Sequence, residues 1–416
     1  MRSLTPWLSR RTLISWPRRL ASTCFQHQPR RWTSSSGNQK HSAPLRILFC
    51  GSDEFSEPSL IALHEELQSP DSPILSIDVV TKADKYHGRN NKQLYQTGLG
   101  CLAERCGLPV HKIDTFTGWQ PPVYDSTFNP EINLIVAVSF GLLIPMRIIN
   151  GATYGGLNVH PSMLPNLPGA APISWAILHN LTHTGVSVQT LHPTKFDGGI
   201  VLNQTPYPGM KIPDKDNITS QELTKILGRM GAKLLVDAIR NKLYIPPYEA
   251  VPSTLDESGI LRAPKLNTGT WTIDFQTMSK DSILRRLRTA RMGVLSSGAK
   301  TFGSDEKLTI KLAYVRLPTV HDIPSDIQDE LLSIPTGLPY TFSDGNADLK
   351  SSSGPLFVNV TPDQPGRLRQ LVIPDITVPS KDRGPAARAA FRAKLFRPDP
   401  VKIGPYHLWL FAHPLS

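Results

Sequence analysis

Cysteine, acidic residues near the start of the chain and long apolar runs are all scarce in this sequence. Four of the 416 residues are cysteine, and the one close pair, Cys101 and Cys106, has no further ligands at the spacing of a zinc site. A disulfide scaffold and a metal site are therefore not expected. No apolar run reaches the roughly 18 residues of a membrane-spanning helix, so we predict no membrane span. A P-loop sequence is also missing, which argues against nucleotide hydrolysis.

The first 40 residues contain no Asp or Glu. They hold seven arginines and Lys40, and the first acidic residue of the chain is Asp53, so most of the net charge of +11 lies here. An Arg-rich, Ser-rich and acid-free start is typical of a mitochondrial transit peptide. We therefore predict that residues 1–44 are a disordered transit peptide, cleaved before Leu45, and that the protein acts in the mitochondrial matrix. The alternative is a basic arm that binds nucleic acid.

Residues 45–245 alternate between short apolar runs and amphipathic segments. The run Leu134–Val138 is continuous and apolar, as is typical of a central parallel strand that is covered on both faces. Residues 218–241 instead have the period of a long amphipathic helix. Strands that alternate with helices predict an α/β domain with a doubly wound, mostly parallel sheet. The other predicted strands include Leu45–Gly51, 74–81, Gly156–His160 and 185–191.

The pattern changes in the second half of the chain, where short alternating runs such as Leu356–Val360 are found. We predict a linker over residues 246–262 and a second, β-rich domain over residues 263–416. Residues 319–354 are rich in Pro, Asp, Ser and Gly, and we predict that they form a disordered insertion in this domain.

One short stretch combines polar residues with a predicted strand end. Asn158 and His160 are two residues apart, so they share one face of the strand, and Pro161 places them at its carboxyl end, where open α/β sheets bind ligands. Asp197 stands further on in a turn before Gly198-Gly199. An amide can hold an oxyanion, an imidazole can move a proton and a carboxylate can orient the imidazole. Each residue alone is more often structural, but together Asn158, His160 and Asp197 predict acyl transfer without a nucleophilic side chain.

Two other motifs are weaker. Gly98-Leu-Gly100-Cys-Leu-Ala103 has the spacing of a dinucleotide fingerprint, but no buried strand precedes it, so a helix with small residues is the better interpretation. His179 and His183 have the spacing of a zinc helix but lack its glutamate, which favours a solvated turn.

The segment Asn158-Val-His-Pro-Ser-Met-Leu-Pro165, continued by Gly169-Ala-Ala-Pro172 and joined by Asp197-Gly-Gly, resembles the folate-dependent formyltransferase superfamily. Within it, the chain is similar to the mitochondrial branch that acts on methionyl-tRNA. The resemblance covers about residues 45–316 and the rest loosely. Two further matches lie in the first domain: Phe49–Phe55 resembles the family's first strand and turn, and residues 136–145 resemble its folate-side strand and loop. Residues 263–265 with 273–275 resemble the start of the family's C-terminal domain. Gly88-Arg89, in the polar loop 82–92, falls in the loop that in the family reaches the tRNA acceptor stem.

The resemblance implies a complete reaction. The formyl donor would be 10-formyltetrahydrofolate as co-substrate, with no metal, and the acceptor would be the α-amine of initiator methionyl-tRNA. Asn158 and His160 would stabilise the tetrahedral oxyanion, His160 would help to remove the amine proton, and Asp197 would steady His160. The folate pocket would be lined by Ser162, Met163, Leu164 and Pro165 and by Phe140, Gly141 and Leu142.

The tRNA side of the resemblance rests on the second domain, which in the family is an OB-like barrel, a shape suited to nucleic-acid backbones. Residues 251–416 hold 21 basic and 16 acidic residues. The candidates for tRNA contacts are Arg89, Lys265, Arg285, Arg286 and Arg288, although any of them could instead belong to a solvated helix face.

Alternatives remain open at this point. The same fold could formylate a sugar amine or a ribotide, or hydrolyse formyltetrahydrofolate, and a catalytically silent tRNA-binding protein is a further possibility. The transit peptide and the basic second domain favour tRNA. Pro168 stands where the family usually has Arg, which puts a contact at that position in doubt. A monomer is our default expectation.

Overall fold

The computed structural model describes residues 40–87, 93–124, 131–253, 257–290, 294–300, 307–312, 314–319, 321–344, 354–361, 370–378, 384–403, 405–413 and 415. The chain divides into a unit Met1–His41 and a unit Ser42–Ser416. The predicted transit peptide lies almost wholly outside the described residues, and so does Arg89. Within the described part of the chain, no helix has both the length and the apolar character that a membrane span requires.

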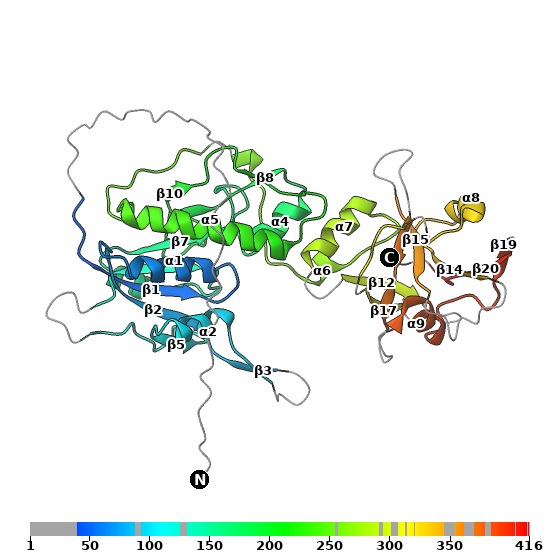
Figure 1. Ribbon diagram of the computed structural model, residues 1–416, viewed down its shortest axis with the longest axis horizontal. Coiled ribbons are helices and arrows are strands. Elements are labelled where there is room, and N and C mark those ends of the chain that lie inside the picture. Colours follow the sequence, from blue (N-terminus) through cyan, green and yellow to red (C-terminus); the bar gives the residue numbers. More distant parts are fainter. Residues whose placement is uncertain are drawn as a thin grey trace, which may run out of the picture. The chain divides into compact units, whose positions relative to one another are not determined.

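A seven-stranded sheet forms the centre of the first domain, in the order β10-β9-β7-β6-β1-β2-β5 (Figure 1). The five strands from β5 to β7 run parallel, whereas β9 pairs antiparallel with both β7 and β10. The predicted mostly parallel α/β sheet is thus confirmed. Its strands are β1 (Leu45–Gly51), β2 (Ile74–Lys82), β5 (Val110–Ile113), β6 (Leu134–Val138), β7 (Gly156–His160), β9 (Ser187–Thr190) and β10 (Val201–Gln204).

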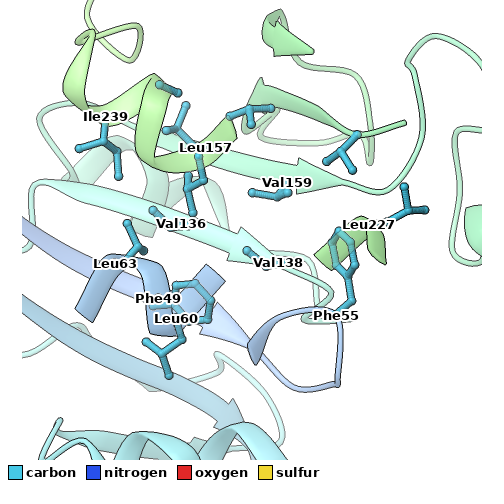
Figure 2. Close-up of a cluster of buried hydrophobic side chains, with 14 of the residues drawn as sticks. Phe49, Phe55, Leu60, Leu63, Val136, Val138, Leu157, Val159, Leu227 and Ile239 are labelled. Carbon is cyan, nitrogen blue, oxygen red and sulfur yellow. The ribbon is translucent and has the colours of Figure 1, made fainter. Parts of the chain in front are cut away.

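Helices cover both faces of this sheet because alternate residues of each strand point to opposite sides. Phe49 belongs to a hydrophobic core with side chains of α1, α2 and α5 on one face, and Figure 2 shows it beside Leu60 of α1, whereas Leu48 and Cys50 belong to a core with α3 on the other face. Helix α5 begins with a capping box in which Thr219 and Glu222 bond each other's backbone N–H groups. The helices are α1 (Glu57–Leu67), α2 (Gly98–Arg105), α3 (Met146–Gly151), α4 (Pro172–Leu178) and α5 (Ser220–Arg240).

Two short pairs of strands complete the first domain. The ends of the predicted polar loop 82–92 are not loop but a hairpin of β3 (Lys85–His87) and β4 (Gln93–Tyr95), in which Tyr86 pairs with Leu94. The second pair is β8 (His183–Thr184) with β11 (Met210–Lys211). The glycine motif at Gly98 lies in α2, after the cap residue Thr97, and not after a buried strand.

The second domain is β-rich, as predicted, and contains a four-stranded and a five-stranded sheet. A single hydrophobic core takes side chains from both, among them Ile310, Tyr340 and Val358. The four-stranded sheet has the order β12 (Val294–Lys300), β13 (Lys307–Leu312), β17 (Asp375–Thr377), β18 (Gly384–Pro385). The five-stranded sheet has the order β16 (Gln370–Ile373), β15 (Leu356–Asn359), β14 (Pro339–Asp344), β20 (Tyr406–Leu410), β19 (Val401–Ile403). Its α-helices are α6 (Thr268–Trp271), α7 (Lys280–Thr289), α8 (Gln328–Leu332) and α9 (Ala386–Arg392).

The prediction of a disordered insertion over residues 319–354 is wrong for residues 321–344. This stretch contains α8 and β14, and β14 is the middle strand of the five-stranded sheet. Its polar composition is misleading because several of its few apolar residues, among them Ile327, Leu331 and Tyr340, are buried in the domain core. Residues 345–353 lie outside the described residues.

Candidate active site

The carboxyl ends of β1, β6 and β7 lie side by side at one edge of the central sheet. Gly51 pairs with Val138, and Val138 pairs with Val159, so all three strands end at the same level. The Ser52 hydroxyl donates a hydrogen bond of 2.9 Å to the Ser139 carbonyl, which ties the turns after β1 and β6 together. Ligand sites in open α/β sheets form at such an edge.

His160 and Asp197, two of the three predicted catalytic residues, form a buried pair at this edge. The distance from Nδ1 of His160 to Oδ1 of Asp197 is 3.1 Å, and the His160 residue is only 5% exposed. Asp197 adopts a φ of 53°. Its second oxygen, Oδ2, accepts a hydrogen bond from the Gly169 N–H at 2.8 Å, and Nε2 of Gln189 donates to Oδ1 at 3.3 Å.

These bonds decide the charge of Asp197. Burial pushes the pKa of this carboxyl upward, but the hydrogen bond and charge of His160 pull it down, and the bonds from Gly169 and Gln189 add to that effect. The net result is a pKa below the usual range for Asp, so the pair contains a carboxylate at neutral pH.

The other ring nitrogen of His160 is also occupied. Nε2 lies 3.0 Å from the carbonyl oxygen of Leu167, and a carbonyl oxygen can only accept a hydrogen bond. Because the Asp197 carboxylate is an acceptor too, each ring nitrogen of His160 faces an acceptor. The ring is therefore placed to donate hydrogen bonds, and Nε2 has to leave Leu167 before it can exchange a proton with a substrate.

Asn158 lies next to this pair on the same face of β7. It is half-buried, and it stands between Ala137 of β6 and Gln189 of β9. Among the described residues, its side-chain amide has no hydrogen-bond partner, whereas its neighbours Gln189 and His160 are fully engaged. An unpaired amide donor beside a donating imidazole is suited to binding an oxyanion.

Three polar residues that the sequence interpretation missed support this arrangement. Ser187 and Gln189 are two apart on β9, so they face the same way as Asn158 and His160, with which they pair directly. The Ser187 hydroxyl donates to the Ser162 carbonyl at 2.7 Å, and Gln204 donates to the Leu164 carbonyl at 2.8 Å. The polar alternation Ser187-Val-Gln189 in an otherwise buried strand is the signal that could have found them.

A cavity of about 170 Å³ lies at one of the two predicted folate segments. It is lined by residues 162–167 with Leu181, His183, Thr184, Gln204, Tyr207 and Pro208, and it includes neither the His160–Asp197 pair nor residues 140–142. Phe140 is buried against Phe116 after β6, whereas Gly141 is exposed and Leu142 half-buried. Ser162 and Leu164 are buried, and the Ser162 hydroxyl donates to the Asn166 carbonyl. Met163 and Pro165 are half-buried.

The predicted tRNA-binding arginines lie on α7, where they are half-buried. Arg288 donates to the Lys215 carbonyl at 2.6 Å, and Arg286 donates to the Ser282 hydroxyl at 2.6 Å. In the described part of the chain, the buried Nε atoms of Arg285, Arg286 and Arg288 have no hydrogen-bond partner. Burial, with the nearby charge of Arg285, lowers the pKa of Arg286 and Arg288. Lys265 is exposed.

Residues 45–239 match the model of the formyl transferase family, so this part of the chain is similar to that family. The chain is similar to mitochondrial methionyl-tRNA formyltransferases. It is 35% identical to that of Saccharomyces cerevisiae over 259 residues and 31% identical to that of Homo sapiens over 248 residues. These matches cover 55% and 59% of this chain and 62% and 57% of the relatives, so the chain spans about three fifths of their length. The predicted resemblance is thus confirmed.

Among solved structures, a sugar N-formyltransferase from Shewanella sp FDAARGOS_354 matches 66% of this chain and 99% of its own. The identity is 15% and the TM-score 0.42, which is too distant to carry an argument about the acceptor.

Proposed function

We propose that this protein transfers the formyl group of 10-formyltetrahydrofolate to the α-amine of initiator methionyl-tRNA, in the mitochondrial matrix. The observation that supports it most is the buried His160–Asp197 pair with the unpaired Asn158 amide beside it, within a formyl transferase domain. The relatives' name, mitochondrial methionyl-tRNA formyltransferase, suggests the acceptor and the compartment.

The reaction needs no nucleophilic side chain because the substrate amine is the nucleophile. The neutral amine attacks the formyl carbon of the folate, and the resulting oxyanion accepts hydrogen bonds from the Asn158 amide and from His160. Nε2 of the protonated His160 first leaves the Leu167 carbonyl and gives its proton to the departing folate nitrogen, and the neutral ring then takes the surplus proton of the former amine. The Asp197 carboxylate holds the ring through Nδ1 and stabilises its charged form before and after this exchange.

The folate would bind at the carboxyl edge, with residues 140–142 on one side and residues 162–165 on the other. Because Ser162 and Leu164 are buried, their contribution would come from backbone groups, whereas the exposed Gly141 allows close approach. Lys82 is the nearest cation to that turn, since a Cβ placed on Gly141 would lie 3.1 Å from its Nζ.

The tRNA would bind through the second domain, as an OB-like fold does, and through Arg89. Three arginines support this, because they lie together on α7 and are only half-buried, so that a phosphate can approach them: Arg285, Arg286 and Arg288. We expect the affinity for tRNA to fall steeply with salt, and an Arg285→Gln variant to lower the salt slope by about 1. A flat salt dependence would remove the second domain from the proposal.

The deciding experiment offers the full chain labelled 10-formyltetrahydrofolate with methionyl-tRNA, a sugar amine, a ribotide or no acceptor. We expect label only in methionyl-tRNA and a monomer in solution. Label in a sugar amine or ribotide would assign a different acceptor, and free formate without an acceptor would indicate a hydrolase. Binding of tRNA without any turnover would indicate a silent binding protein.

A further inference from the structure

The loop that follows His160 is attached to the linker between the two domains. The catalytic loop, residues 161–171, runs beside the linker segment, residues 261–264, and four hydrogen bonds join them. Leu167 N–H donates to the Leu261 carbonyl at 2.8 Å, and Ala263 N–H donates to the Pro168 carbonyl at 2.9 Å. The other two are Ala171 N–H to the Ala263 carbonyl at 3.1 Å and Leu261 N–H to Oδ1 of Asn166 at 3.0 Å.

The same loop also bonds the His160–Asp197 pair, through backbone groups that make no bond to the linker. Leu167 uses its N–H for the linker and its carbonyl for Nε2 of His160, at 3.0 Å. Gly169 lies between two linker contacts and gives its own N–H to Oδ2 of Asp197, at 2.8 Å. The short segment 167–169 is therefore hydrogen-bonded both to the linker and to both residues of the His160–Asp197 pair.

Gly169 shows how close this approach is. Its φ of 131° is outside the range that other residues adopt readily, and a Cβ at this position would lie 2.3 Å from the Ala263 carbonyl oxygen. Trp175 adds a further anchor because its indole N–H donates to the Pro264 carbonyl at 2.8 Å.

We propose that the linker segment is a structural part of the active site, and that Asn166 and Gly169 are positioning residues for the His160–Asp197 pair. The inference deepens the proposed function and rests on it, because it treats that pair as the catalytic one. It means that the linker, which leads into the second domain, reaches the pair through backbone hydrogen bonds, separately from the contacts proposed between that domain and the tRNA.

The test replaces the side-chain bond that anchors the linker. Asn166→Leu keeps the size of the side chain but removes the acceptor for Leu261 N–H, and Asn166→Asp keeps that acceptor. Asn133→Leu is the matched control: Asn133 is buried and bonds the backbone of Pro44 and Arg46 on the amino-terminal side of β6, away from the site. We measure kcat, both KM values and melting temperature for all three.

We expect Asn166→Leu to lower kcat roughly 10- to 100-fold with both KM values kept, because small misplacements of catalytic groups cost that much. Asn166→Asp should restore most of kcat, and Asn133→Leu should lower the melting temperature while leaving kcat within about 2-fold. Equal kcat in the two leucine variants, or an Asn166→Asp variant as slow as Asn166→Leu, would overturn the proposal.

Hydrogen exchange provides a readout that needs no substrate. In Asn166→Leu, amides of residues 166–171 should exchange faster than in the native protein, and unchanged exchange there would contradict the proposal. Because this result does not depend on the acceptor, it separates a failure of the linker inference from a failure of the proposed function. If Asn166→Leu does not fold, Trp175→Phe takes its place, with faster exchange and a smaller loss of kcat expected for the same reason.

Discussion

Two histidine–aspartate pairs lie in the described part of the first domain, and their comparison shows how a candidate catalytic pair differs from a pair that joins strands. In the first pair His160 lies 3.1 Å from Asp197, and in the second Nε2 of His111 lies 2.9 Å from Oδ1 of Asp78. Distance and burial of the carboxylate do not separate them, since Asp78 is only 1% exposed.

The surroundings do separate them. Asp78 lies within β2, pairs with Leu48 of β1, and accepts its second hydrogen bond from the Tyr124 hydroxyl, so its oxygens are occupied by side chains that lock β2, β5 and the following loop together. The His160 pair instead stands at a strand end, beside an amide without a partner and a loop held through backbone groups. What marks the His160–Asp197 pair as a candidate for catalysis is therefore the group beside it, the Asn158 amide, which has no hydrogen-bond partner among the described residues.

The largest expected difference comes from removing each imidazole. His160→Ala should lower kcat for formylation by about 10³- to 10⁴-fold, because it removes both proton transfer and an oxyanion donor. His111→Ala, the matched control, should keep kcat within about 2-fold but cost roughly 2 kcal/mol of stability, because Asp78 loses a buried hydrogen bond. Kinetics and urea unfolding of both variants check this. Near-native turnover in His160→Ala would sink the mechanism.

Asn158 is the next test, because the second pair has no counterpart to its unpaired amide. Asn158→Ala should lower kcat about 10²- to 10³-fold with little change in either KM, as expected for a donor that binds the oxyanion. Stability should change little, since the amide has no partner among the described residues to lose. Steady-state kinetics and a melting curve measure both, and a loss seen only in KM would place Asn158 in ground-state binding instead.

A smaller effect is expected in the pH dependence of kcat/KM, which should respond to a change beside the His160–Asp197 pair. The pKa of Asp197 is held below its usual range, so its ionised form persists above that pKa and is lost as the pH falls through it. Gln189→Met removes one hydrogen-bond donor to the Asp197 carboxylate. Because that bond lowers the pKa of Asp197 and burial raises it, the pKa should rise in this variant. The acid limb of kcat/KM should therefore move to higher pH.

The control for this prediction is Gln96→Met, which removes a similar bond of 3.3 Å to Asp84, an aspartate that bonds Lys112 and not His160. Its pH profile should match that of the native protein. An acid limb that stays in place in Gln189→Met would show that Gln189 does not tune Asp197.

How much could be predicted from the sequence follows from the range of the interactions involved. Strands β1, β6 and β7 and the residues Asn158 and His160 follow from local period and from one proline. Asp197 could be added to the predicted site because it stands before Gly198-Gly199 and matches the family motif. What was missed depends on contacts between distant segments: the pairing of Gln189 with Asn158 across two strands, the attachment of residues 261–264 to the loop after His160, and the burial of Ile327 and Tyr340 within a polar stretch. A local pattern can mark a residue such as Gln189 but does not say which distant segment it contacts.

The smallest effect concerns the phenol that completes the second pair. Tyr124 donates to Oδ2 of Asp78, and burial together with that bond raises the pKa of Tyr124, so the hydroxyl stays protonated and bonded across the working range. Tyr124→Phe should cost about 1 kcal/mol of stability, the typical worth of one hydrogen bond, and leave kcat unchanged. The same substitution at Tyr86, which is exposed and distant from any such bond, should change stability by less than about 0.5 kcal/mol and serves as the control. Urea unfolding resolves the two, and a change in kcat for Tyr124→Phe would mean that the His111–Asp78 pair takes part in the reaction after all.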